Sequence, residues 1–136
     1  MDNINMDELY QKALVAAQAA YSPYSHFRVG AALLGADNSI YTGCNVENRS
    51  FGLTICAERT AVTKAVSEGC RSFKALAIST PDSAVPVGPC GACRQVLSEF
   101  MPADAPVRFG GHSGERVNTT ISELLPHDSL HDLGKA

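Results

Sequence analysis

Three cysteines and one glutamate lie in two short segments whose residue types suit a catalytic metal site. Cys56 and Glu58 are two residues apart, and Cys90 and Cys93 follow within the sequence PCGAC at 89–93. Three thiolates leave one position of a tetrahedral zinc ion open, and water bound there loses a proton near neutral pH. We therefore predict one Zn²⁺ per chain, held by Cys56, Cys90 and Cys93, with Glu58 as the catalytic proton carrier.

Other interpretations of these residues stay open on spacing alone. A structural zinc site needs a fourth protein ligand, and a redox pair at Cys90 and Cys93 leaves Cys56 unexplained. The alternative for Glu58 is an ordinary carboxylate at a helix start, favoured by the helix dipole. The remaining cysteines, Cys44 and Cys70, are isolated, and we expect them to be thiols in or near the core.

Both cysteine segments are predicted to begin helices, where the positive end of the helix dipole favours a thiolate. Apolar residues recur at helical spacing over 56–68, with Gly69 as C-cap, and a second helix is expected over 90–100. A helix over 6–20, with Asn5 as N-cap, opens the chain. The other expected elements are strands over 29–34, 39–44, 73–79, 107–109 and 115–117, a polar loop over 45–52, a turn over 110–114 and a helical turn over 120–125.

This order of elements predicts one α/β domain over residues 1–136, a three-layer α/β/α sandwich with a mixed central sheet of about five strands. No repeat, low-complexity segment or linker indicates a second domain. The strand over 73–79 is apolar enough to be buried on both faces. Because both cysteine segments begin helices, we expect them to meet at one end of the sheet.

Composition and charge restrict the kinds of molecule that the protein could bind and the compartment in which it works. The formal net charge is −3, and the 11 Lys and Arg residues form no basic run, which argues against a nucleic acid polymer. No apolar run reaches membrane-spanning length, and residues 1–7 are polar and acidic, unlike a secretory signal. Five cysteines favour metal binding or catalysis in a reducing compartment over a disulfide framework. We expect a cytoplasmic protein that acts on a small molecule.

With these segments placed, the chain resembles the small cytidine deaminases that act on free nucleosides. Zinc deaminases combine a first His or Cys ligand, a Glu two residues later and a downstream P-C-x-x-C. The three-cysteine form is that of the free-nucleoside family, whereas relatives acting on tRNA, DNA or deoxynucleotides usually place His first. The resemblance covers about residues 10–125 and rests on YSPYSHF at 21–27, GCNVEN at 43–48, CAERTA at 56–61, PCGACRQV at 89–96 and ELLP at 123–126.

The resemblance implies a reaction and a set of substrate contacts. Glu58 would carry a proton from water to the ring nitrogen and then to the departing amine, so that cytidine and 2′-deoxycytidine become the uridines with release of ammonia. Asn45 and Glu47 would bind the ribose hydroxyls. Phe27 would lie against the nucleoside, and the backbone at Ala57 would help hold the base. By composition alone, Asn45 and Glu47 are turn residues and Phe27 is a core residue.

Charge counting gives Arg59 a supporting role. Three thiolates on Zn²⁺ leave a net charge of −1, which weakens the ability of the metal to acidify water. An arginine next to Glu58 that donates to the thiolates offsets this charge from outside the ligand shell. The resemblance implies the same role.

The resemblance also implies a homotetramer with sites shared between subunits and the tail 126–136 at a subunit interface. Two features depart from the family pattern. The family usually carries a Phe after its Leu-Leu-Pro that stacks on the base of a neighbouring subunit's substrate, yet no Phe, Tyr or Trp follows Phe109 here. Arg49 and Phe51 stand where the family more often has Ala and Tyr. The candidates to replace the missing aromatic side chain are His127, Leu130 and His131.

Two further functions therefore stay open. A deaminase of a modified cytosine nucleoside, of the blasticidin S type or an amine-substituted cytidine, is suggested by the altered tail and by Arg49. The non-enzymatic alternative is a zinc-stabilised binding or assembly module, against which the open metal position and Glu58 argue. The histidines are expected to be solvated, and they are His26, His112, His127 and His131.

Overall fold

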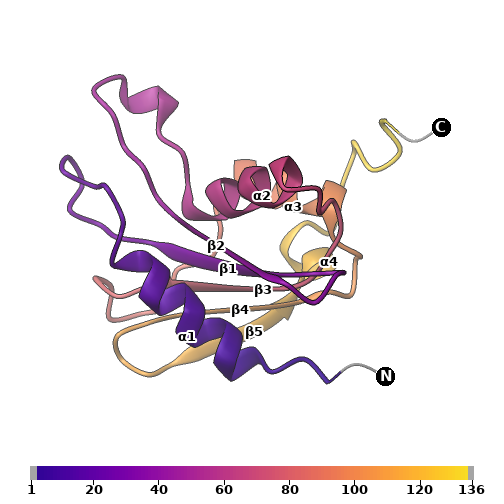
Figure 1. The fold of residues 1–136 in the computed structure, drawn as a ribbon, viewed down its shortest axis with the longest axis horizontal. Helices are drawn as coiled ribbons and strands as arrows, with labels where there is room; N and C mark the ends of the chain where they lie inside the picture. Colours follow the sequence, from indigo (N-terminus) through magenta and orange to yellow (C-terminus); the bar gives the residue numbers. More distant parts are fainter. Residues whose placement is uncertain (1–2, 135–136) are drawn as a thin grey trace.

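The computed structural model describes residues 3–134, so the ends of the predicted domain at 1–2 and 135–136 lie outside the described residues. A five-stranded sheet lies between α1 on one face and α2 and α3 on the other (Figure 1). The strand order is β2-β1-β3-β4-β5, with β3 and β4 parallel and the other pairs antiparallel. The predicted three-layer sandwich with a mixed sheet is confirmed. The elements are α1 (Met6–Ala17), β1 (Gly30–Gly35), β2 (Ile40–Cys44), the 3₁₀ helix η1 (Phe51–Leu53), α2 (Ala57–Ser67), β3 (Phe73–Thr80), α3 (Gly91–Phe100), β4 (Pro106–Gly111), β5 (Arg116–Thr120) and α4 (Ile121–Leu124).

The two faces of the sheet bury side chains of different size. Successive residues of a strand point to opposite faces, so Leu76 and Ile78 of β3 face α2 and α3, whereas Ala75 and Ala77 face α1. Small residues let α1 approach the sheet closely, and a Cβ at Gly30 would lie 1.9 Å from the carbonyl oxygen of Ala13. The larger residues form the core beneath the two cysteine-bearing helices, which holds those helix starts in place.

Phe73 is fully buried in this larger core and lies 6.2 Å, between ring centroids, from Phe100 of α3. We expect Phe73→Ala to lower the free energy of unfolding by about 3–5 kcal/mol, because the lost ring leaves a cavity. Urea denaturation measures the change. The matched control is Val15→Ala on the exposed side of α1, where Val15 is 69% exposed and the change should stay within about 0.5 kcal/mol.

The predicted helix caps are confirmed, while one helix end was predicted wrongly. The Asn5 side chain accepts a hydrogen bond from the Glu8 amide at 3.0 Å. Gly69 has φ +100°, and the following amide of Cys70 donates to the Ala65 carbonyl at 2.9 Å, which closes α2. The helix predicted over 6–20 ends at Ala17, because the next three amides bond carbonyls three residues back and tighten the chain into a turn.

Two loops differ from expectation. The turn predicted over 110–114 is shorter, since Gly110 and Gly111 extend β4 and Gly111 pairs with Thr80. A Cβ at Gly111 would lie 2.0 Å from the Ser83 carbonyl oxygen, so this close approach requires glycine. The loop predicted over 45–52 leads into η1, which was not predicted, and the chain around η1 projects from the body of the molecule (Figure 1).

Candidate active site

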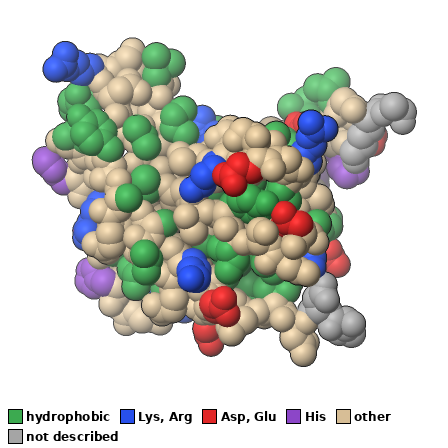
Figure 2. Space-filling model, viewed as in Figure 1, with side chains coloured by type: hydrophobic (Ala, Val, Ile, Leu, Met, Phe, Trp, Pro, Cys, Tyr) green, Lys and Arg blue, Asp and Glu red, His purple; other side chains and the backbone are tan. Residues whose placement is uncertain are grey.

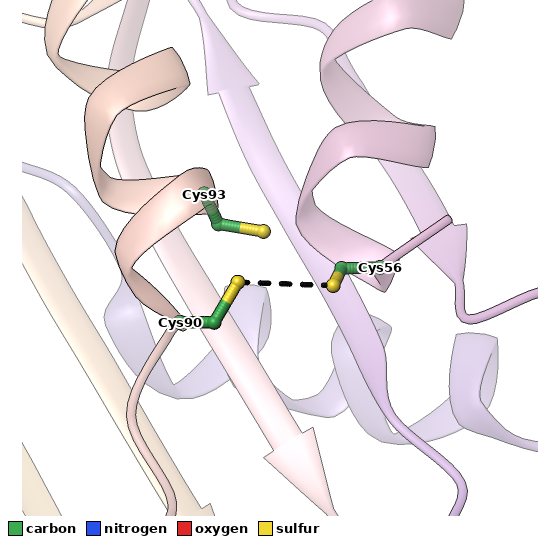
Figure 3. A group of neighbouring side chains, drawn as sticks. All are labelled: Cys56, Cys90 and Cys93. Carbon is green, nitrogen blue, oxygen red and sulfur yellow. Dashed lines mark hydrogen bonds between the residues drawn. The ribbon is translucent and has the colours of Figure 1, made fainter. Parts of the chain in front are cut away.

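Cys56 and Cys90 occupy equivalent positions at the starts of two helices. Cys56 is the N-cap residue of α2 and Cys90 that of α3, both with extended backbone. Cys93 lies in the first turn of α3 and is fully buried. The three thiols point toward one another between the two helix starts (Figure 3). The two cysteine segments therefore lie next to each other, as predicted.

The spacing of the three sulfurs fits a tetrahedral zinc ion. Their Sγ atoms lie within 4.8 Å of one another, and those of Cys56 and Cys90 are 3.9 Å apart. Zinc–sulfur bonds of about 2.3 Å at tetrahedral angles place two sulfurs about 3.8 Å apart. Within residues 3–134, no fourth His, Cys, Asp or Glu side chain joins this group. The donor set is that of a zinc site with one open position.

The ionisation of the three cysteine thiols also indicates that this cluster binds a cation. The pKa of Cys56 falls to about 5, because hydrogen bonds from Cys93 and then from Arg59 stabilise its thiolate. The pKa of Cys93 rises, first because of its hydrogen bond with Cys56 and then because it is buried. The protein groups alone thus stabilise one thiolate, and a divalent cation is the group that balances three.

Arg59 lies one helical turn beyond Cys56 and makes the contact that its predicted role requires. Its Nη2 atom donates to Cys56 Sγ at 3.2 Å, which raises the pKa of Arg59. The guanidinium therefore places a positive charge directly against the thiolate cluster. Its Nε atom is buried without a hydrogen-bond partner among the described residues.

Glu58 lies in the first turn of α2 with its side chain turned inward. The residue is only 4% exposed, and burial raises the pKa of its carboxyl to about 7, with the negative charge of Cys56 adding to the rise. A surface carboxylate at a helix start keeps water around it and shows no such shift. The burial and the raised pKa of Glu58 therefore fit a proton carrier better than an ordinary carboxylate at a helix start.

A cavity of ≈ 180 Å³ opens beside the thiols and Glu58. Its lining comes from segments far apart in the chain: Val29 and Asn45 precede and follow the β1–β2 hairpin, while Val87 and Gly88 belong to the loop before α3. Ala57 and Glu58 line it at the start of α2, where backbone amides of a first helical turn have no partner within the helix. The complete lining is Val29, Asn45, Thr54, Cys56, Ala57, Glu58, Ile78, Thr80, Val87, Gly88 and Cys90.

Comparisons with known proteins agree with this site. The family description "Cytidine and deoxycytidylate deaminase zinc-binding region" matches residues 4–108. The chain belongs to this deaminase family. Curated cytidine deaminases are 50% identical over 123 residues in Sporosarcina psychrophila, with 90% of each chain covered, and 53% identical over 118 residues in Halalkalibacterium halodurans, with 87% of this chain and 89% of the relative covered.

A solved structure supports the same assignment. The crystal structure of cytidine deaminase from Burkholderia pseudomallei superposes with a TM-score of 0.85 at 42% identity, covering 90% of this chain and 98% of that chain. Family membership and the three-cysteine cluster confirm the predicted enzyme class, a zinc-binding deaminase, and the predicted cofactor. The non-enzymatic module is thereby set aside. Separately, no helix within residues 3–134 has the length and hydropathy needed to cross a bilayer.

Asn45 both lines the cavity of this deaminase and fixes its wall. The residue is 7% exposed, its Oδ1 accepts from the Val29 amide at 2.9 Å, and its Nδ2 donates to the Phe27 carbonyl at 2.8 Å. The side-chain amide of Asn45 thus binds the backbone of residues 27–29 and not the backbone of its own turn. The Nδ2 group has two N–H donors, and only one of them takes part in these two bonds.

Glu47 and Phe27, the other predicted substrate contacts, lie outside the cavity lining. The Glu47 carboxylate accepts from the amides of Tyr24 and Ser25, each at 3.1 Å, and from the Ser25 hydroxyl. These bonds lower the pKa of Glu47, the Ser25 hydroxyl contributing most. Glu47 therefore holds the turn before Phe27, and Phe27 is half-buried at the end of that turn.

Sequence reasoning did not single out several residues that line the cavity. Thr80 ends β3 and Ile78 lies two residues before it, so both point to the face of the sheet that α2 and α3 cover. Val87 and Gly88 are the two residues directly before the PCGAC segment. The position of Ile78 and Thr80 at the end of an apolar strand was a usable signal, whereas the inward placement of Val87 depends on how its loop folds back.

Arg59→Gln should weaken zinc retention and lower kcat, each by about 10–100-fold, because the neutral amide no longer offsets the charge of the thiolates. Chelator competition followed by metal analysis measures retention. Arg71→Gln is the matched control, since Arg71 is an exposed arginine just after α2. Equal zinc retention in both variants would contradict the charge-balancing role of Arg59.

Proposed function

We propose that this protein hydrolyses cytidine and 2′-deoxycytidine to uridine and 2′-deoxyuridine, with release of ammonia. The observation that carries the proposal is the convergence of three thiols and a buried carboxyl on one cavity. The relatives that match over about 90% of the chain are named cytidine deaminases, which supports cytidine as the substrate.

In the proposed mechanism Glu58 carries the protons. When bound, zinc supplies a Lewis acid that makes water nucleophilic at neutral pH. Glu58, which is buried in the cavity lining two residues from Cys56, takes one proton of the attacking water and delivers it to the ring nitrogen, while the water oxygen bonds the amino-bearing carbon. It then takes the second proton from that oxygen and delivers it to the amino group, which leaves as ammonia when the carbon–nitrogen bond breaks. Cys56, Cys90 and Cys93 hold the metal.

The nucleoside would enter with its base toward Glu58. Ala57 lines the cavity in the first turn of α2, so its backbone amide is proposed to donate to the base carbonyl. The leftover Nδ2 N–H of Asn45 can donate to a ribose hydroxyl. Glu47 and Phe27 are proposed to complete the ribose and base contacts, Glu47 after exchanging part of its bonding to the 24–25 turn.

We further propose a homotetramer with sites shared between subunits. Residues 46–55, which include η1 and are called the arm below, expose a set of apolar side chains whose burial would stabilise an assembly. Green side chains gather on this projection in Figure 2. Its members are Val46 at 39%, Phe51 at 67%, Leu53 at 66% and Ile55 at 41% exposed. The tail 126–136, of which residues 126–134 are described, exposes Leu130 and Leu133 and is proposed to meet the same interface.

We also propose that the enzyme is cytoplasmic and has a single domain. Three zinc-binding thiolates are best preserved in a reducing compartment, which supports a cytoplasmic enzyme. Residues 1–136 are proposed to act as one domain. The net charge of −3 supports a free nucleoside over a nucleic acid polymer.

A second candidate substrate is a modified cytosine nucleoside. Arg49 is an exposed cation on the projecting arm, and no Phe, Tyr or Trp follows Phe109. Both features change the surroundings of the base from the family pattern, and they favour a substrate with an additional polar or negatively charged group.

Initial rates across a substrate panel separate the two candidates. The panel is cytidine, 2′-deoxycytidine, blasticidin S and an amine-substituted cytidine. We expect cytidine and 2′-deoxycytidine to be turned over with the highest kcat/KM. Turnover of blasticidin S or the substituted cytidine without turnover of plain cytidine would favour the second candidate.

A further inference from the structure

Arg28 and Asp82 form a bidentate ion pair between two segments far apart in the chain. Arg28 Nη2 donates to Asp82 Oδ1 at 2.8 Å, and Arg28 Nε donates to Asp82 Oδ2 at 3.1 Å. The backbone amide of Arg28 also donates to Oδ2, at 2.8 Å. One carboxylate thus binds both the side chain and the main chain of Arg28.

The main-chain bond fixes a segment that forms one wall of the cavity. Asn45 bonds the Phe27 carbonyl and the Val29 amide, which point to one side of residues 27–29. The Arg28 amide between them points to the other side, as alternate amides of an extended chain do. Asp82 takes this donor. The segment that places Val29 in the cavity is therefore held from both sides, by Asn45 and by Asp82.

Asp82 also lies near the start of the loop that contributes a second group of residues to the cavity lining. The loop runs from the end of β3 at Thr80 to Cys90 and places Val87 and Gly88 in the cavity lining. The start of the loop is also held by the His112 amide, which donates to the Ser83 carbonyl at 2.8 Å. Residues within it remain exposed, Val85 at 61% and Val87 at 37%.

We propose that Asp82, through its bonds to Arg28, is a positioning residue for nucleoside binding. It sets the distance between the wall that carries Val29 and the wall that carries Val87, and so the width of the slot that receives the base. Asp82 itself is not part of the cavity lining and touches no reacting group. This inference rests on the proposed nucleoside deaminase function.

The chemistry of the pair suits this role. The two side chains are 37% and 26% exposed, so the pair adds little to global stability, as surface ion pairs generally do. Its bidentate geometry gives directional control that a single contact lacks. Hydrogen bonds from Arg28 lower the pKa of Asp82 to about 2, so the carboxylate is charged under all working conditions.

The test compares Asp82→Ala and Asp82→Asn with Asp104→Ala, which alters an exposed aspartate in the turn before β4. We expect Asp82→Ala to raise KM for cytidine by about tenfold while kcat stays within about twofold and zinc content is unchanged. Asp82→Asn should show a smaller rise, because its amide oxygen still accepts from the Arg28 backbone. Asp104→Ala should leave both constants unchanged.

Hydrogen exchange of the peptides that cover 24–30 and 80–88 gives a readout independent of turnover. Both peptides should exchange faster in Asp82→Ala than in the wild type. An unchanged KM, or a fall in kcat together with zinc loss, would overturn the proposal, since the latter would assign Asp82 to the support of Cys90. If the wild type fails to deaminate cytidine, the proposed function is wrong, and unchanged exchange in Asp82→Ala would then overturn the pairing of the two walls as well.

Discussion

Glu58→Gln should lower kcat for cytidine by about 10⁴-fold while zinc content and thermal stability stay close to those of the wild type. Glutamine has the same shape but cannot accept and return a proton, and a well-placed acid–base group contributes up to about 10⁴-fold to rate. The site stays packed, because the amide fills the space of a side chain that is 4% exposed. Steady-state kinetics, metal analysis and thermal unfolding on the same sample measure the three quantities.

The matched control for this variant is Glu68→Gln at the other end of the same helix. Glu68 is the exposed C-cap residue of α2, so its replacement should leave kcat unchanged. A Glu58→Gln protein that keeps most of its activity would show that another group carries the proton. Within the described chain the cavity lining offers no second carboxylate for that task.

Cys93→Ala should abolish zinc binding and activity together. Cys93 is the fully buried member of the cluster, and two remaining thiols, on different helices, hold zinc far more weakly than three. Because zinc binds the folded state, its loss also removes stability, about 2.7 kcal/mol when free zinc stands at 100 times its dissociation constant. Metal analysis and thermal unfolding with and without added zinc measure both effects.

Cys70→Ala is the control for the loss of a buried thiol. Cys70 follows the C-terminus of α2 and lies outside the metal cluster, so its replacement should leave zinc content and activity unchanged. Unchanged zinc content in Cys93→Ala would show that Cys93 is a core residue and that the metal is held elsewhere. We expect the fold itself to persist in both variants, because the core between the sheet and the helices does not depend on the metal.

The placement of the three cysteines and of Glu58 could be predicted because it is local. Cys56 and Cys90 stand at the starts of helices that the spacing of apolar residues predicts, and Glu58 is fixed to Cys56 by helix geometry. Their convergence then needs only the packing of two helices on one sheet face. The helix caps at Asn5 and Gly69 were predictable for the same reason.

Features that depend on distant contacts could not be predicted. The bonding of Glu47 to the turn at Tyr24 and Ser25 joins residues more than twenty apart, and the Arg28–Asp82 pair joins residues 54 apart. Nothing near either position in the sequence indicates its partner. The extension of β4 to Gly111 likewise depends on Ser83, whose carbonyl leaves room for no side chain there. Arg49 and η1 lie on an arm whose position follows from neither periodicity nor turn chemistry.

The most direct test of the central claim is the turnover of cytidine by the purified, zinc-loaded protein, followed by ultraviolet absorbance and by product analysis. We expect uridine and ammonia to form in equal amounts in the wild type, with uridine forming about 10⁴-fold more slowly from Glu58→Gln at the same concentration. A folded protein that retains one zinc per chain and forms no uridine would contradict the assignment of cytidine as its substrate.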